Sequence, residues 1–173
     1  MEGLTRYAEG TFQPMSLPSG ACCTFHRGCC VDREGRLWFG VGYYPGCPPT
    51  AYRWDGRRLD RITLPNPEGI GGSVFCIAAD SKGDLWFGVW ANLYRYDGER
   101  FHRVAGPSSP AGYIWSLLPR SDGSLWIGGS GGLFVYAEGR LEPLEEAIMG
   151  YLIMAFLEDS SGGAWLTTHE GQV

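Results

Sequence analysis

Apolar positions in this sequence fall into short runs, and polar turn residues separate them. The clearest case lies in the middle of the chain, where SVFCIAAD (73–80) and DLWFGVW (84–90) are almost continuously apolar. The two runs that follow, NLYRYD (92–97) and RFHRVA (100–105), mix apolar and polar residues. The linkers are Ser-Lys-Gly, the hinge residue Ala91 and Asp-Gly, which are hairpin signals. This pattern predicts a four-stranded antiparallel meander.

The two inner strands of this meander are apolar on both faces. A sheet with one face in water would alternate apolar and polar residues, so these strands must be covered on both sides. A propeller blade is buried between its two neighbours in this way. The meander is therefore expected to be one blade of several.

The chain repeats this unit. One anchor is a tryptophan, and its spacings are 48, 40 and 39 residues: Trp38, Trp86, Trp126 and Trp165. A second anchor has a similar period: YAEGTF (7–12), WDGRRL (54–59), YDGERF (96–101) and YAEGRL (136–141). A strand-rich period near 40 residues is typical of propeller blades. We expect an all-β fold of about four four-stranded blades within a larger propeller. The expected units are 20–64, 72–105, 112–146, and 151–173 with 3–17 as a composite blade or two partial ones.

Some positions recur because packing requires them. The repeated Trp is interpreted as a residue that packs between blades, with a sugar-stacking platform as the lesser alternative. The Gly three residues before it is expected to supply a positive φ in the turn between the first two strands: Gly35, Gly83, Gly123 and Gly162. Three of these turns begin with an aspartate: Asp32, Asp80 and Asp159. In the remaining turn, the third along the chain, Arg120 takes the place of the aspartate.

Composition excludes several classes of protein. A net charge of −5 without a basic stripe disfavours nucleic acid as a partner. The longest apolar run, YLIMAFL (151–157), is of strand length, so no membrane contact is expected within this segment. The first ten residues have neither a basic nor an apolar segment, and no signal peptide is expected in this chain.

Motifs for catalysis and metal binding are weak. The run GGSGG places Ser130 in G-x-S-x-G, but a nucleophile elbow needs a following helix, and LFVY (133–136) predicts a strand. The three histidines fall in different units, and the cysteines lack C-x-x-C spacing, so no metal or cofactor is expected. A disulfide is predicted between loops that share one propeller face, from among Cys22, Cys23 and Cys47. Cys29 and Cys30 align with inner-strand residues and are interpreted as small apolar fillers, and buried free thiols remain the alternative to a disulfide.

The repeat D-x-x-G-x-L-W-(I/F)-G, followed by G-L-x-x-Y-x-x-G-x-(F/L), resembles the two-component regulator propeller repeat. Residues 80–101 and 120–141 match it closely. The resemblance implies a bacterial sensor, in which a non-catalytic ligand-sensing or signal-coupling propeller lies in the periplasm or otherwise outside the cytoplasmic membrane. It also implies that the full-length protein is anchored in the membrane and contacts neighbouring sensor domains. The alternatives are a generic protein-interaction propeller and, less favoured, a propeller lyase or glycosidase.

A ligand is expected on one face of the propeller. In each blade, strands a to d follow one another along the chain, and the b-to-c and d-to-a connections share this face. It gathers exposed aromatic and polar residues that packing does not require: Tyr43, Tyr44, Trp90 and His169. The alternative is that Trp90 and the two tyrosines only cap the end of the ring. Such residues suit a small carbohydrate or a peptide, because they combine apolar stacking with hydrogen-bonding edges.

Overall fold

The computed structural model describes residues 4–15, 25–42, 48–66, 69, 72–144 and 148–169, with only the backbone for residues 4, 15 and 25–27. All sixteen elements in these ranges are β-strands. A search of the same ranges for a helix long and apolar enough to cross a membrane finds none.

Three complete blades are formed, each an antiparallel sheet whose strands follow one another in chain order. The first contains β3 (Phe25–Val31), β4 (Leu37–Val41), β5 (Thr50–Trp54) and β6 (Leu59–Thr63). The second contains β7 (Val74–Ala79), β8 (Leu85–Val89), β9 (Asn92–Tyr96) and β10 (Phe101–Ala105). The third contains β11 (Ile114–Pro119), β12 (Leu125–Gly129), β13 (Gly132–Ala137) and β14 (Arg140–Pro143). The predicted propeller blades are confirmed.

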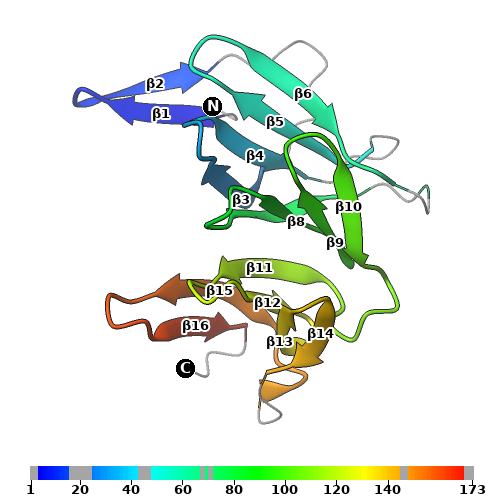
Figure 1. Ribbon diagram of the computed structural model, residues 1–173. Helices are drawn as coiled ribbons and strands as arrows, with labels where there is room; N and C mark the ends of the chain where they lie inside the picture. Colours follow the sequence, from blue (N-terminus) through cyan, green and yellow to red (C-terminus); the bar gives the residue numbers. More distant parts are fainter. Residues whose placement is uncertain are drawn as a thin grey trace.

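Two further hairpins lie at opposite ends of the stack of blades (Figure 1). They are β1 (Leu4–Ala8) with β2 (Thr11–Met15), and β15 (Ile153–Glu158) with β16 (Ala164–Thr168). Each is a two-stranded sheet of its own, so the described residues do not join them into a composite blade. The structure is an open arc of three blades with a half blade at each end.

The core lies between the blades. One cluster joins the first and second blades around Trp38, Val74 and Phe87, and another joins the second and third around Trp86, Ile114 and Phe134. Both faces of the second blade are therefore buried, as its continuously apolar inner strands predict. Strand β8 shows this most clearly, because all five of its residues are buried.

Close approach between blades depends on glycine. Strand b of each complete blade contains Gly at its fourth position, and the first residue of the next blade's strand a lies directly against it. A Cβ on Gly40 would come within 2.7 Å of the Val74 side chain, and one on Gly88 within 2.8 Å of the Ile114 side chain. Gly128 and Ile153 repeat this arrangement. We call these three glycines the glycine sockets.

The turns between strands a and b are built as the sequence predicts, with one addition. The four turn glycines have φ between +75° and +89°. Asp32 Oδ1 accepts the backbone N–H groups of Glu34 and Arg36 at 3.1 and 2.9 Å. The other oxygen, Oδ2, accepts the indole N–H of Trp38 at 2.7 Å. We call this Asp and the Trp six residues later the Asp–Trp clamp.

The clamp recurs with Asp80 and Trp86, at 2.9 Å, and with Asp159 and Trp165, at 3.2 Å. Each of the first three Trp rings then packs edge-on against an aromatic ring of the following blade. Trp38 contacts Phe87, Trp86 contacts Tyr136, and Trp126 contacts Phe156, with centroid distances of 5.8, 5.5 and 6.4 Å. The interblade role predicted for the Trp is thus confirmed for these three positions.

Arg120 links the third blade to the hairpin after it. Its guanidinium lies 4.8 Å from the Trp126 ring centroid, donates to the Gly162 carbonyl at 2.6 Å and pairs with Glu158 at 3.0 Å. The other turns have an aspartate that bonds within its own turn. The third turn has Arg120 instead, which bonds to the next half blade.

The cysteines follow the predicted alignment only in part. Cys29 and Cys30 pair with Phe39 and Trp38, as Ile77 and Ala78 pair with Phe87 and Trp86. Cys30 packs against the core, and burial raises the pKa of its thiol to about 12. Cys29, however, is an exposed free thiol, so its interpretation as an apolar filler is wrong. Its side of β3 points away from the second blade. The predicted disulfide residues, Cys22, Cys23 and Cys47, lie outside the described residues.

Candidate ligand-binding site

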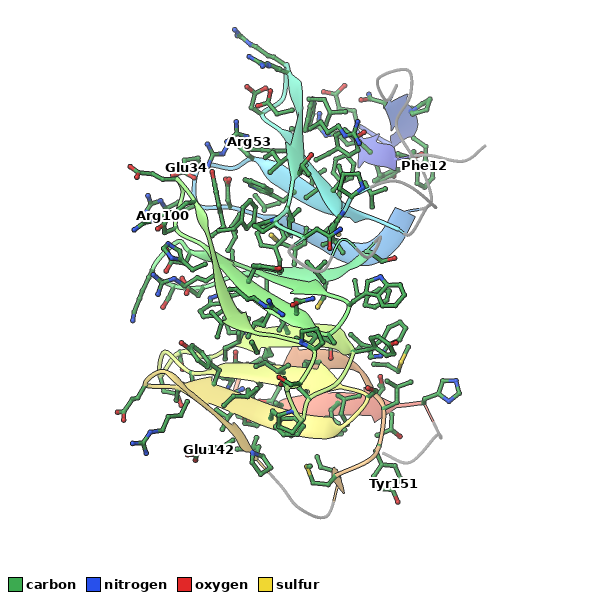
Figure 2. The ribbon with its side chains drawn as sticks, turned by 90° about the vertical axis from the view of Figure 1, so that its right-hand side faces the viewer. Phe12, Glu34, Arg53, Arg100, Glu142 and Tyr151 are labelled. Atoms are coloured by element: carbon green, nitrogen blue, oxygen red, sulfur yellow. The ribbon has the colours of Figure 1, made fainter. Side chains whose placement is uncertain are left out.

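The two faces of the arc differ in chemistry. The turn face carries the a-to-b and c-to-d turns, and charged residues gather there. Glu34 and Arg100, from turns in different blades, extend on the same side of the molecule (Figure 2). Asp97 lies in one of these turns, where backbone N–H groups and His102 hold the pKa of its carboxyl far below the usual range. These charges are paired within their own turns.

The opposite face, which we call the connection face, carries the b-to-c and d-to-a connections and contains a cavity of about 330 Å³. The cavity lies over the second blade, and loops of the first and third blades form its sides. Its lining residues are Pro49, Pro65, Asn66, Gly72, Val89, Trp90, Ala91, Asn92, Pro107, Gly112, Tyr113 and Ser130. None of them is Asp, Glu, His, Lys or Arg.

Trp90 forms one wall of the cavity from a strained backbone position. It begins the two-residue loop between β8 and β9, and its φ is +52°. Glycine is the usual residue there, because positive φ is costly for a bulky side chain. Two backbone hydrogen bonds hold Trp90 in place: its N–H donates to Ser73 at 3.2 Å, and its carbonyl accepts the N–H of Ile114 at 2.8 Å. Strain that the surroundings fix in this way is characteristic of functional sites.

Tyr113 lies beside Trp90, at the entry to the third blade. The two rings meet edge to face, with centroids 5.5 Å apart, and Tyr113 is 45% exposed. The Tyr113 backbone N–H donates to Ser130 Oγ at 2.9 Å, and strand β13 follows Ser130. Ser130 is therefore a hinge residue between two strands, and the strand predicted after it is confirmed.

Asn92 lines the cavity and has an unusual polar atom. Its Oδ1 is buried and accepts no hydrogen bond from the described residues. Buried acceptors are nearly always paired, so such an atom calls for an explanation. A ligand that donates a hydrogen bond would provide one.

The structure brings together only part of the predicted site. Trp90, Ser130 and His169 occupy equivalent places, since their N–H groups donate to Ser73, Tyr113 and Leu152 at the start of the respective strand a. His169 is exposed and does not line the cavity. Tyr43 and Tyr44 lie outside the described residues, and the insertion that contains them leads to Pro49, which does line it.

Sequence reasoning missed Tyr113 and Asn92. Tyr113 stands in a d-to-a connection whose residues do not repeat, so the period carries no information about it. Asn92 begins a strand and looks like an ordinary edge position. Their adjacency depends on the packing of one blade against the next.

No metal centre is indicated in the described ranges, where His, Cys, Asp and Glu form no group of three that could hold an ion. The free thiol of Cys76 is also unsuited to such a role, because burial raises its pKa to about 12.

Comparisons with known proteins agree with this architecture. The sequence model of a family described as two component regulator propeller matches residues 68–91 and 108–131. Each match runs from the loop before strand a to the b-to-c hinge, so the family's repeat starts earlier than the segment we recognised in the sequence. No curated protein matches the chain.

Several solved propellers share the fold. The extracellular domain of the hybrid two component system BT3049 from B. thetaiotaomicron superposes with a TM-score of 0.76 at 20% identity, covering 96% of this chain and 23% of that one. Virginiamycin B lyase from Staphylococcus aureus gives 0.66 at 16%, covering 86% and 54%. The gluconolactonase XC5397 from Xanthomonas campestris gives 0.65 at 17%, covering 96% and 62%. The chain thus spans about a quarter to three fifths of these proteins.

The fold alone does not separate sensors from enzymes, because both occur among these structures. The family match is more specific than the fold, and it falls on the second and third blades. The similarity to two component regulator propeller repeats is thus found in the second and third blades of the chain.

Proposed function

We propose that this chain is part of the ligand-sensing or signal-coupling propeller of an extracytoplasmic bacterial two-component sensor, and that it has no catalytic activity of its own. The repeat match and the likeness to the BT3049 extracellular domain support the sensor role. The full-length protein would then be anchored in the membrane, with neighbouring sensor domains as its partners.

The cavity on the connection face carries the ligand-sensing part of this proposal. It combines a preformed apolar hollow, an aromatic pair and an unpaired acceptor, which is the usual make-up of a binding site. Its described lining offers no carboxylate or imidazole for acid–base catalysis, and this favours binding over the lyase and lactonase activities of propellers with the same fold.

A thermal-shift screen tests the site. Neutral oligosaccharides and short uncharged peptides would be added to the wild type and to Trp90→Ala, Tyr44→Ala and Lys82→Ala variants. We expect a ligand that raises the melting temperature of the wild type and of Lys82→Ala, which lies on the turn face, but raises those of the other two variants less. Equal shifts in all four proteins would place the ligand elsewhere, and no shift with any ligand would contradict the proposal.

The gene on either side of this segment tests the sensor role independently. We expect it to encode a membrane-spanning helix and a kinase or another output module. A complete gene without either would favour the generic interaction propeller.

A further inference from the structure

We propose that the cavity beside Trp90 binds one large, uncharged apolar side chain of a peptide, and that a peptide N–H next to this side chain donates to Asn92. This inference rests on the proposed function, because it assigns a ligand class to the same site. Three features of the cavity carry it: its lining, its polar atoms and its rigidity.

The lining selects against charge. Three prolines, a valine and the Trp90–Tyr113 pair make most of the wall, and no charged side chain is present among the described lining residues. A carboxylate or ammonium group placed here would lose its water without gaining a partner, which is strongly unfavourable. The size of the cavity is at the lower end for ligand sites and suits a single ring or large side chain.

The small number of polar atoms selects against sugars. A pyranose ring carries hydroxyl groups around its whole edge, and each must be hydrogen-bonded when it is buried. The lining supplies polar side-chain groups from Asn66, Asn92 and Ser130, besides the polar edges of Trp90 and Tyr113, and Ser130 Oγ already accepts the Tyr113 N–H. An apolar side chain needs no such partners, so it fits this lining better than a sugar does.

Asn92 supplies the one polar group in the described cavity lining that needs a hydrogen-bond donor from the ligand. Its Oδ1 has no donor among the described residues, and the terminal torsion of Asn is soft enough to turn this oxygen towards the cavity. A peptide bound through its side chain presents a backbone N–H within reach of that side chain. A purely apolar ligand would leave the acceptor unpaired.

The wall is preorganised. The two backbone hydrogen bonds that fix the positive φ of Trp90 also tie it to the start of the second and third blades. A wall whose backbone is held in this way loses little freedom when a ligand binds, and this lowers the entropic cost of binding.

The experiment compares three peptides that differ in one side chain: Ac-Ala-Phe-Ala-NH₂, Ac-Ala-Asp-Ala-NH₂ and Ac-Ala-Ala-Ala-NH₂. Maltose and cellobiose form the saccharide arm. Binding is followed by NMR titration of the tryptophan indole N–H signals, with the Trp90 signal assigned from its loss in Trp90→Phe. We expect saturable shifts of the Trp90 signal with the Phe peptide, and at least about tenfold weaker binding of the other two peptides and of both sugars.

Variants locate the site. Trp90→Gly removes the wall but suits the positive φ, so we expect a melting temperature equal to or above that of the wild type, with at least about tenfold weaker binding of the Phe peptide. Tyr113→Ala should weaken binding without unfolding the protein, because the side chain is half-exposed. Asn92→Leu keeps the size but removes the acceptor, and about a threefold to tenfold loss is expected. Lys82→Ala should bind as the wild type does.

The outcomes separate this inference from the proposed function. If a sugar shifts Trp90 and the Phe peptide does not, the ligand class is wrong while the cavity remains a sensing site. Equal binding of the Phe and Asp peptides, or unchanged binding in both Trp90→Gly and Tyr113→Ala, would overturn the inference. The absence of peptide binding would also overturn it, and the broader thermal-shift screen would then decide on the proposed function.

Discussion

Trp86 and Trp165 occupy the same place in the repeat but differ greatly in environment. Both donate the indole N–H to the aspartate of their own turn. Trp86 then packs against Tyr136 of the next blade and is only 7% exposed, whereas Trp165 has no blade beyond it in the described chain and is 61% exposed.

The comparison separates two contributions of one residue. The Asp–Trp clamp is local and forms in each of the three turns that begin with aspartate. The packing of the ring depends on a second blade. A repeat pattern thus predicts the geometry of each unit, while the energy that a repeated residue contributes depends on its neighbours.

The largest expected effect tests this directly. Trp86→Ala should lower the free energy of unfolding by about 3 to 5 kcal/mol, because a buried aromatic ring loses transfer energy and leaves a cavity. Trp165→Ala is the matched control and should cost less than about 1 kcal/mol, since its ring is largely in water already. Denaturant unfolding measures both. Equal losses would show that the clamp, and not the interblade packing, dominates.

The clamp itself is tested at Asp32. Asp32→Ala leaves two backbone N–H groups and the buried Trp38 indole without an acceptor, and it should cost about 2 to 3 kcal/mol. Asp159, which is less buried than Asp32, is the matched position, and its replacement by Ala should have a smaller effect. If the two replacements cost the same, burial would not determine the strength of the clamp.

The Asp32 contribution should also depend on pH. Burial alone would raise the pKa of this carboxyl, but hydrogen bonds from Trp38 and Arg36 outweigh it and hold the pKa below the ordinary value of 3.8. The unfolded chain therefore binds a proton more readily than the folded protein does. The stability from Asp32 is fully present above pH 3.8 and is lost as the pH falls through the lowered value of the folded protein. Unfolding curves at decreasing pH should show the wild type and Asp32→Ala converging, and a constant difference would contradict this.

A smaller effect is expected at Arg120, which attaches the last hairpin. Arg120→Ala removes the contact with Trp126 and the bonds to Gly162 and Glu158, and should cost about 1 to 2 kcal/mol. Hydrogen exchange should accelerate chiefly in β15 and β16. Lys82→Ala is the control and should change neither quantity. Exchange that accelerates equally in all blades would argue against a local attachment.

Replacing an exposed ring at an open end of the arc should have the least effect on stability and the largest effect on self-association of the protein. The open ends of the arc expose Phe12 by 76% and Trp165 by 61%. Exposed apolar rings beside free strand edges favour pairing with another chain. Sedimentation velocity at increasing concentration should show self-association, and Phe12→Ser or Trp165→Ser should reduce it. A wild-type monomer at every concentration would contradict this expectation.

The repeat made much of the fold predictable. The strands of the second blade begin and end within one or two residues of the predicted positions, and the turn glycines and aspartates act as expected. These features depend on contacts between residues close in sequence. The repeat also predicted how Cys29 and Cys30 pair with the neighbouring strand β4, because residues at equivalent positions of the repeat share the same register.

The features that could not be predicted from the sequence depend on which blades lie side by side. The sequence could not show that Cys29 and Trp165 are exposed, because their position in the repeat is shared with buried residues. It placed Trp90 on the connection face, where the structure has it, but did not identify Tyr113, its neighbour from the next blade. The candidate site was thus predictable as a face of the propeller, and the cavity itself required the structure.

The glycine sockets also bear on the curvature of the arc. Because the missing side chains at Gly40, Gly88 and Gly128 let strand a of the next blade approach closely, they set the distance between blades on the side where strands a and b lie. A methyl group at these positions would act as a wedge there and reduce the angle from one blade to the next. The number of blades needed to complete a circle would then increase, so glycine at these positions helps to set the angle at which a given number of blades can close.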